Sequence, residues 1–566
     1  MKNYSLYKCE EIKDLRELVK RSAERFGNRD AFRIKASDKV CAISYRKLYS
    51  DVKALGTALI SLNLCGKHIA LLGENSYEWV VIYLAAVNVG CVIIPIDKEL
   101  TCSEISAIIK QSESIAIAYS KTFEDTVENL LPKTAIKLCI CFQKQAETGS
   151  SFKCFADLVS LGSRLILQGD DAYNKTLLEK DKMAVILFTS GTTGKSKGVM
   201  LSHKNLSSVI VGAMRTIRTE RVTMSVLPIH HTYECTCGIL TALYAGVTIC
   251  FCDSLKYVPE NLKLFKPSMM VLVPMFLEAM YKKIWDSAKR HGTQKVLKMF
   301  VRLSNALLKF HIDFRPIFFR LVRLAFGGRL KLIISGGAPL RGELVRGFNE
   351  LGIKVLNGYG ITECSPIVAA NRNRYFNEDS VGVVLPCCKV KIDEPDENGE
   401  GEILVKGDNV MLGYYKNEEE TNKVFTNGWF KTGDLGRLDE KGFLYVTGRL
   451  KNTIILSNGK NVQPEELEEY LLGALPYIKE VVVFADEKGG GMEMAIASIF
   501  VFNKDYLEEN GITDPEALLA RDFMDVNRNL PAYKQISKYS CRYEEFEKTT
   551  TKKIKRFKLQ EGNEDA

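Results

Sequence analysis

Long apolar runs, proline and secretory features are what this 566-residue chain has little of. No uninterrupted apolar stretch reaches the ~18 residues that a membrane-spanning helix needs. Segment 1–20 is charged throughout and has no apolar core of a secretory signal. Only 15 residues are proline and 46% are hydrophobic, which excludes a disordered or fibrous chain. These absences predict a globular cytoplasmic protein, with association at the inner face of a membrane left open.

The 16 cysteines do not follow the spacing of a metal or disulfide framework. The pairs Cys139/Cys141, Cys235/Cys237 and Cys387/Cys388 lack the CxxC spacing of zinc sites, so we expect reduced thiols. The net charge of 78 − 69 = +9 is spread along the chain, and no RNA- or DNA-binding signature is present. The composition therefore predicts no nucleic-acid partner, and it suits anionic small molecules or a membrane surface.

The order of apolar and polar segments predicts an α/β fold with more than one domain. A single core rarely grows past ~250–300 residues, so this length requires at least two. Residues 68–97 read as strand, capped helix and buried strand, and the alternation recurs at 183–212, 222–251 and 268–284. We therefore expect a large N-terminal domain of mainly parallel sheets packed with helices.

The pattern of apolar and polar residues changes in the last third of the sequence. From about residue 382 short β-type segments predict a small antiparallel β unit over about 382–447. After Gly448 a helix beginning at Pro464 and two apolar strands predict a compact α+β arrangement. The predicted domains are 1–447, the large domain with its closing β unit, and 448–566, a smaller and mobile C-terminal domain.

A glycine- and hydroxyl-rich segment at 188–200 follows an apolar strand and has the chemistry of a phosphate-binding loop. Its glycines bring backbone N–H groups close to an anion, and its hydroxyls and lysines add donors and charge. It is not a P-loop, because Thr189 stands where that motif requires glycine. Six further motifs follow in order: LPIHH at 227–231, SGGAP at 335–339, GYGITE at 358–363, WFKTGD at 429–434, GRLK at 448–451 and TTTKKIKR at 549–556.

Together these seven motifs resemble the adenylate-forming (acyl-activating) superfamily, most closely its bacterial long-chain fatty acid–CoA ligases. The resemblance extends over about residues 40–556 and implies that ATP is bound. It assigns the nucleotide to Ser190, Gly191, Thr192, Thr193, Gly194, Lys195, Gly336, Gly337, Ala338, Pro339, Gly358, Tyr359, Gly360, Thr362, Asp434 and Arg449. Within that set Tyr359 would stack on the adenine and Asp434 would accept both ribose hydroxyls.

The same resemblance implies a set of catalytic residues: Lys553, His231, Glu363 and Thr189. Glu363 would hold Mg²⁺ against the phosphates, because a hard cation prefers carboxylate oxygen. Lys553 would reach the reacting carboxylate and α-phosphate, although the neighbouring Lys552 stands where the family has glycine and the choice between the two lysines stays open. His230 and Gly336 would line the acyl pocket, and Lys451 would be the hinge about which the small domain turns.

The implied reaction is ATP-dependent activation of a long-chain fatty acid to acyl-AMP, followed by transfer to coenzyme A with release of AMP and pyrophosphate. GGRL at 327–330 and NGYGITECSPIV at 357–368 carry the likeness to long-chain enzymes. The alternative acceptor is the phosphopantetheine thiol of an acyl carrier protein, which the net positive charge could attract. The partners expected are thus fatty acid, ATP and CoA, with a carrier protein as alternative.

Residues 295–323 mix leucine, phenylalanine and valine with seven lysines and arginines and a single acidic residue, Asp313. Such a segment suits an anionic bilayer, and it equally suits a helical hairpin packed on the large domain. Two other classes of protein fit the sequence less well. Thr189 disfavours a P-loop kinase or ATPase. A catalytically silent lipid-binding protein would be expected to lack Glu363, Asp434 or the terminal lysine, and this sequence has all three.

Overall fold

The computed structural model describes residues 3–36, 39–143, 151–189, 196–456, 461–486, 495–548, 554 and 556. The chain forms two compact units. Unit 1 comprises Met1–Val390, Val405–Phe430 and Glu440–Leu444, and unit 2 comprises Lys391–Leu404, Lys431–Asp439 and Tyr445–Ala566. The domain limits at 447 and 448 stay a prediction, because compactness alone does not show which part folds without the other.

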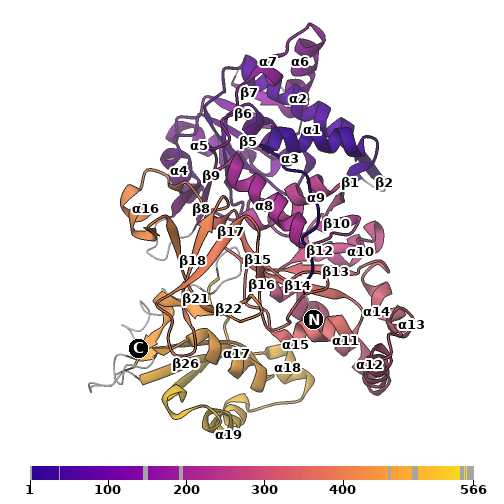
Figure 1. Cartoon of the computed structure of the whole chain (residues 1–566), viewed down its shortest axis with the longest axis vertical. Coiled ribbons are helices and arrows are strands. Elements are labelled where there is room, and N and C mark those ends of the chain that lie inside the picture. The colour runs from indigo at the N-terminus through magenta and orange to yellow at the C-terminus, as the bar shows by residue number, and fades with distance from the viewer. Residues whose placement is uncertain are drawn as a thin grey trace. The chain divides into compact units, whose positions relative to one another are not determined.

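Unit 1 contains two large sheets with helices around them, as the sequence predicted (Figure 1). Along the first sheet the strands run β16 (Gly382–Val384), β15 (Ile367–Ala370), β14 (Lys354–Gly360), β13 (Leu332–Ser335), β12 (Met269–Leu272), β10 (Val222–Ser225), β11 (Thr248–Phe251), β1 (Asp30–Ala36) and β2 (Lys39–Ser44). From β14 to β1 all neighbours are parallel. The α/β class is therefore confirmed, and the carboxyl ends of β10, β12, β13 and β14 share one edge.

The second sheet of unit 1 is also mainly parallel. Its strands run β19 (Gly413–Tyr414), β9 (Lys197–Ser202), β8 (Met183–Thr189), β4 (Val92–Ile96), β3 (His68–Leu72), β5 (Ala116–Tyr119), β6 (Leu138–Cys141) and β7 (Phe152–Cys154). The predicted strand–helix–strand unit is β3, α3 (Tyr77–Asn88) and β4, with β3 and β4 parallel. Helix α3 starts at Ser76, whose hydroxyl accepts the N–H of Trp79. Apart from the half-buried Glu78 in its first turn it is buried along its whole length, as a covered core helix must be.

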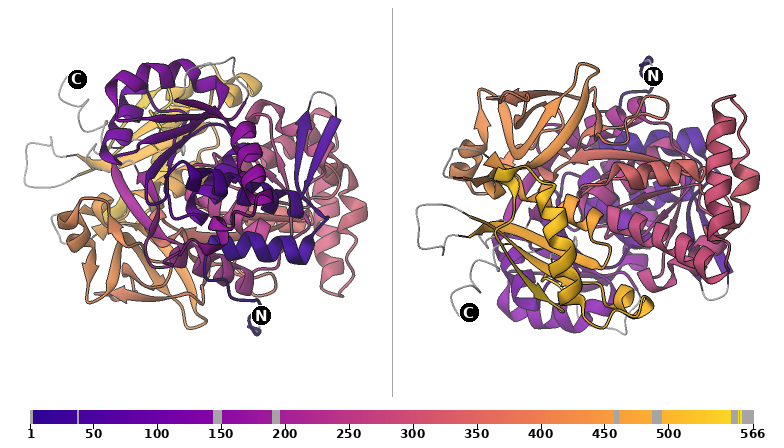
Figure 2. Two further views of the ribbon diagram at one scale, coloured as in Figure 1. Left: turned by 90° about the horizontal axis from the view of Figure 1, so that it is seen from above. Right: turned by 90° about the horizontal axis from the view of Figure 1, so that it is seen from below.

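Three helices at one edge of unit 1 correspond to the basic insertion: α12 (Gln294–Leu308), α13 (Arg315–Phe318) and α14 (Arg320–Ala325), which both views of Figure 2 place together. They pack on the unit through Phe319 and Phe326, which belong to its core, while Phe300 and Phe318 stack at 4.9 Å between ring centroids. The helical hairpin packed on the large domain is thus observed. No helix in the described part of the chain is long and apolar enough to cross a bilayer.

Unit 2 has its own core, built as the sequence predicted. Strands β25 (Ile478–Asp486) and β26 (Ala495–Phe502) are antiparallel, and β27 (Lys538–Arg542) runs parallel to β26. Helices α17 (Pro464–Ala474) and α19 (Pro515–Arg528) both begin with proline, whose missing N–H costs nothing in the first turn. Leu467 and Leu471 of α17 and Leu519 of α19 bury against Phe500 of the sheet.

Candidate active site

A cavity of about 80 Å³ in unit 1 gathers the glycines that the sequence assigned to nucleotide and acyl group. The ends of β13 and β14 contribute Gly336, Gly337, Gly358, Tyr359 and Gly360. The remaining walls are mostly apolar and come from α8 (His203–Thr216), from η3 (Tyr233–Leu240) and from neighbouring strands; they include Ala213, Met214, Ile217, Cys237, Ala242, Met269 and Ile367. The glycines and the tyrosine predicted to bind the nucleotide thus lie beside an apolar chamber, at the carboxyl edge of a parallel sheet.

Two of these glycines lie where a neighbouring group leaves little or no room for a side chain. A Cβ on Gly360 would lie 1.9 Å from the carbonyl oxygen of Pro366, where β14 pairs with β15. A Cβ on Gly336 would lie 3.2 Å from the ring of Tyr233, whose hydroxyl donates to the carbonyl of Ile334 at 3.1 Å. The open space beside these strands therefore depends on missing side chains. By contrast, Ala338 and Pro339 are exposed and do not line the cavity.

Thr362 and Glu363 lie in η5 (Thr362–Cys364), the short helix that follows β14. The hydroxyl of Tyr414 donates to Oε1 of Glu363 at 3.1 Å and fixes that carboxylate. Burial and the facing carboxylate raise the pKa of Tyr414, so it acts only as a donor here. A half-buried, oriented carboxylate is the donor type that Mg²⁺ prefers, so the residue present fits the ion.

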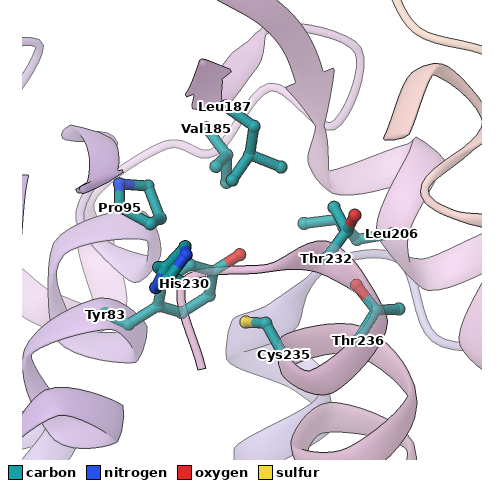
Figure 3. A pocket seen from close by; sticks show the side chains of 9 residues that line it. All are labelled: Tyr83, Pro95, Val185, Leu187, Leu206, His230, Thr232, Cys235 and Thr236. Atoms are coloured by element: carbon teal, nitrogen blue, oxygen red, sulfur yellow. The ribbon is translucent and has the colours of Figure 1, made fainter. Parts of the chain in front are cut away.

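His230 and His231 lie between β10 and η3, and their rings are 4.3 Å apart between centroids. His230 is buried, and its Nε2 is 3.5 Å from Oδ1 of Asp97, which follows β4 of the other sheet. His230 does not line the large cavity. It borders a second, much smaller cavity of about 10 Å³, together with Tyr83, Cys235 and Thr236, and Figure 3 shows these side chains around it.

Asp434 and Arg449 pair within unit 2. Arg449 Nε donates to Oδ1 of Asp434 at 2.9 Å, and the Thr432 hydroxyl accepts the N–H of Asp434 at 3.1 Å. Gly433, within strand β21 (Trp429–Leu438), takes a positive φ of 69°, which suits glycine. Lys451 lies in η6 (Leu450–Asn452) and is exposed. The predicted ribose-binding carboxylate and Arg449, which was also predicted to bind the nucleotide, therefore contact one another directly.

Part of the predicted site lies outside the described residues: Ser190, Gly191, Thr192, Thr193, Gly194 and Lys195 of the phosphate loop, and both Lys552 and Lys553. The loop's flanks are described. Thr189 ends β8, and its hydroxyl donates to the carbonyl of Lys197 at 3.5 Å. Lys197 forms an ion pair with Glu420 at 2.5 Å, so its charge has a protein partner here.

Glu234 and Asp97 were not among the sequence predictions. Glu234 is fully buried on η3, and burial raises its pKa to about 8, although the Ser225 hydroxyl opposes the shift. The carboxyl group is therefore protonated near neutral pH. Gly238, four residues on, leaves space for it: a Cβ there would lie 2.7 Å from the carboxyl carbon. A lone acid in the apolar run YECTCGIL, with glycine one turn later, is the signal that could have identified it.

Comparison with known proteins agrees with the motifs. Residues 19–415 match the model of the AMP-binding enzyme family, and residues 451–563 match the AMP-binding enzyme C-terminal domain. The chain belongs to the AMP-binding enzyme family. It is thus an adenylate-forming ligase, and the resemblance drawn from its seven motifs is confirmed.

Among the relatives of this family member is a long-chain-fatty-acid–CoA ligase of Mycobacterium bovis, 30% identical over 470 residues that cover 80% of this chain and 76% of the relative. A long-chain-fatty-acid–[acyl-carrier-protein] ligase from the chloroplast of Arabidopsis thaliana is 27% identical over 89% of this chain and 78% of its own length. Among solved structures, an anthranilate CoA ligase in complex with anthranoyl-AMP matches 99% of this chain and 98% of its own, with a TM-score of 0.76 and 19% identity, which supports the fold.

Proposed function

We propose that this enzyme activates a long-chain fatty acid with ATP and transfers the acyl group to coenzyme A. The observation that carries the proposal is the apolar cavity lined by Gly336 and by Gly358–Gly360 at the end of β14. An apolar chamber beside the predicted adenylate position suits a hydrocarbon chain, and it offers few hydrogen-bond partners to a polar acid. Met214 and Met269 in its wall are unbranched and flexible, so they can repack around chains of different length.

In the first half-reaction a carboxylate oxygen of the acid attacks the α-phosphorus of ATP, and the bond to pyrophosphate breaks. Glu363 would hold the Mg²⁺ that screens the phosphate charge, and Tyr359 would stack on the adenine. His231 would lie at the reacting centre, and Lys553 would neutralise the charge that develops there. In the second half-reaction a thiolate attacks the acyl carbon and AMP leaves, after the predicted C-terminal domain, 448–566, turns about Lys451.

The test is AMP formation from ATP with acids from acetate to oleate, with and without CoA. We expect AMP and acyl-CoA only with long chains and only when CoA is supplied. AMP formation that is equally fast with acetate would contradict a long-chain acyl site in the large cavity.

A carrier protein is the second candidate acceptor, and the Arabidopsis relative, which is named for that acceptor, favours it. The net charge of +9 would also assist docking of an acidic protein. Side-by-side turnover with CoA and with a phosphopantetheinylated carrier protein separates the two. Faster acyl transfer to the carrier protein would replace CoA in the proposal and leave adenylation intact.

The terminal lysine is tested by a matched pair of variants. Lys553→Ala should slow acyl-AMP formation by about 100-fold or more, because a placed cation stabilises the transition state. Lys552→Ala removes the same charge one residue away and should leave the rate within about threefold. The reverse pattern would move the role to Lys552.

We also propose that the α12–α14 segment contacts an anionic bilayer, from which a long-chain acid could be taken up. Large apolar side chains are exposed along it: Val296, Met299, Leu303, Phe310, Ile312, Phe314, Ile317, Leu321 and Leu324. Phe310 is 75% and Leu321 81% exposed. Lysines and arginines alternate with them, and the acidic Asp313 is already paired with Arg315 at 2.7 Å. Apolar and basic side chains on one exposed segment suit the interface of anionic lipids.

Sedimentation with phosphatidylserine-containing vesicles tests this contact. Phe310→Ser with Leu321→Ser should weaken binding about tenfold or more, since each large side chain loses its burial in lipid. The matched control is Leu167→Ser with Leu177→Ser, two leucines that are 87% and 84% exposed elsewhere in unit 1. Equal loss in both double variants would contradict a dedicated surface.

A further inference from the structure

The small cavity lined by His230 lies next to a group of side chains of which the proposed reaction uses only His231. Asp97, His230 and His231 come from the carboxyl ends of β4 and β10, strands of different sheets in unit 1. One ligand atom from each of the three lies within 4.8 Å of the other two. Two imidazoles and one carboxylate that converge from separate elements form a donor set that metal ions use.

His230 gives the strongest indication that something is bound here. It is only 7% exposed, and its Nε2 has no hydrogen-bond partner among the described residues. A buried polar atom without a partner is costly, and such an atom in a native protein points to an ion or an ordered water. The Asp97 carboxylate, 3.5 Å away, is too far for a normal hydrogen bond but close enough to share an ion with that nitrogen.

The adjacent cavity supplies room for one more ligand. Its volume of about 10 Å³ is near the smallest that holds a water molecule, and Thr232 and Thr236 make part of its wall polar. Three protein ligands and one water would complete a four-coordinate site. Cys235 also borders the cavity, but burial raises the pKa of its thiol to about 12, so it would not supply a thiolate.

We infer that Asp97, His230 and His231 bind a divalent transition-metal ion, with Zn²⁺ as the best match to the donors. Imidazole nitrogen suits Zn²⁺, Co²⁺ and Ni²⁺, whereas Mg²⁺ takes oxygen ligands and would not use two histidines. With metal–ligand distances of about 2.0–2.1 Å the donors must approach to roughly 3.3 Å. The separations now present, at most 4.8 Å, therefore need a closure of up to about 1.5 Å, within reach of side-chain rotation.

The ion has a consequence that rests on the proposed function. His231 would serve both the metal and the adenylating centre, and it cannot do both at once. Zn²⁺ bound at this site would therefore slow acyl-AMP formation, while Mg²⁺ at Glu363 supports it. The site would make the enzyme sensitive to free transition metal.

The binding test uses metal-free full-length protein titrated with Co²⁺, followed by its visible absorption and by equilibrium dialysis without ATP. We expect one Co²⁺ per chain, with ligand-field bands and without a thiolate charge-transfer band. Asp97→Asn should weaken binding about tenfold or more, and His230→Gln should weaken it at least as much. Glu99→Gln, an exposed acid two residues from Asp97, is the control and should bind like the wild type.

Three results would overturn the site: no ligand-field bands with the wild type, a thiolate band that traces the ion to cysteines, or equal affinity in Asp97→Asn. The first two need no variant, so a misfolded mutant cannot hide the answer. AMP formation is then measured with buffered free Zn²⁺ and excess Mg·ATP. Binding with no basal activity would retain the metal site and reject the proposed function, whereas binding without inhibition would reject the sharing of His231.

Discussion

The two cavities that border η3 differ in size and in the groups that line them. The large one, about 80 Å³, is lined by Tyr233 and Cys237 on one side of the helix, and by apolar side chains and glycines beyond it. The small one, about 10 Å³, is lined by Cys235 and Thr236 and contains the edge of a buried imidazole. One helix thus separates a chamber that suits a hydrocarbon chain from one that suits a water or an ion.

The largest expected effect comes from filling the large cavity. Cys237→Trp would place an indole where we expect the acyl chain, so kcat/KM for oleate should fall about 100-fold. AMP release across the acid ladder measures this. Cys237→Ser keeps the volume and should keep the long-chain preference. If Cys237→Trp has the same kcat/KM for oleate as the wild type, the acyl chain binds outside the large cavity.

Glu234, on the helix between the cavities, should make stability depend on pH. Burial raises the pKa of Glu234 to about 8, so the folded protein retains a proton that the unfolded chain loses above about pH 4.3. The folded state binds more protons across this window, and stability falls as pH rises, by up to about 1.4 kcal/mol per pH unit.

Glu234→Gln removes the ionisable carboxyl group and keeps the shape of the side chain. Its free energy of unfolding should match the wild type near pH 4 and exceed it increasingly towards pH 8. Urea unfolding at three pH values measures the difference. A constant offset between the two proteins would mean that Glu234 titrates normally.

The smallest effect should come from Tyr233→Phe. It removes the hydroxyl that donates to the Ile334 carbonyl, which should cost about 1 kcal/mol of unfolding free energy and leave the cavity apolar. Tyr83→Phe is the counterpart on the small cavity, where the hydroxyl lies beside the Cys235 thiol. Urea unfolding should show a similar small loss of unfolding free energy for both variants. A loss of several kcal/mol in one variant would mean that the cavity beside that tyrosine collapses without the hydroxyl.

The elements with one clear periodicity could be predicted from the sequence. The β3–α3–β4 unit follows from a continuous apolar run, the serine cap and a glycine turn, and α17 follows from its proline start. The seven motifs also led to the family, because glycine, carboxylate and aromatic residues at fixed spacing reflect backbone and ligand contacts.

The sequence could not show which residues meet across the two sheets. Asp97 and His230 are far apart in the chain, and their 3.5 Å approach depends on how β4 and β10 are arranged in unit 1. His230 was predicted to line the acyl pocket, yet it borders the small cavity, since a vicinal histidine pair gives no indication of which ring faces which space. The acyl-pocket roles of His230 and Gly336 both stay predictions, and of these two residues Gly336 is the one that lines the large cavity.

The wide turn of η3 has a consequence for how such enzymes diverge. The N–H of Thr241 bonds to the carbonyl of Thr236, five residues back, so this helix holds one residue more per turn than an α-helix allows. Deletion of one residue here would restore α-helical hydrogen bonding. It would also rotate every later side chain of the helix by roughly 100° about the helix axis. Residues that now face the large cavity would then face the protein interior. A one-residue gap at this point between two relatives would therefore mark a change of acyl specificity more surely than many point substitutions.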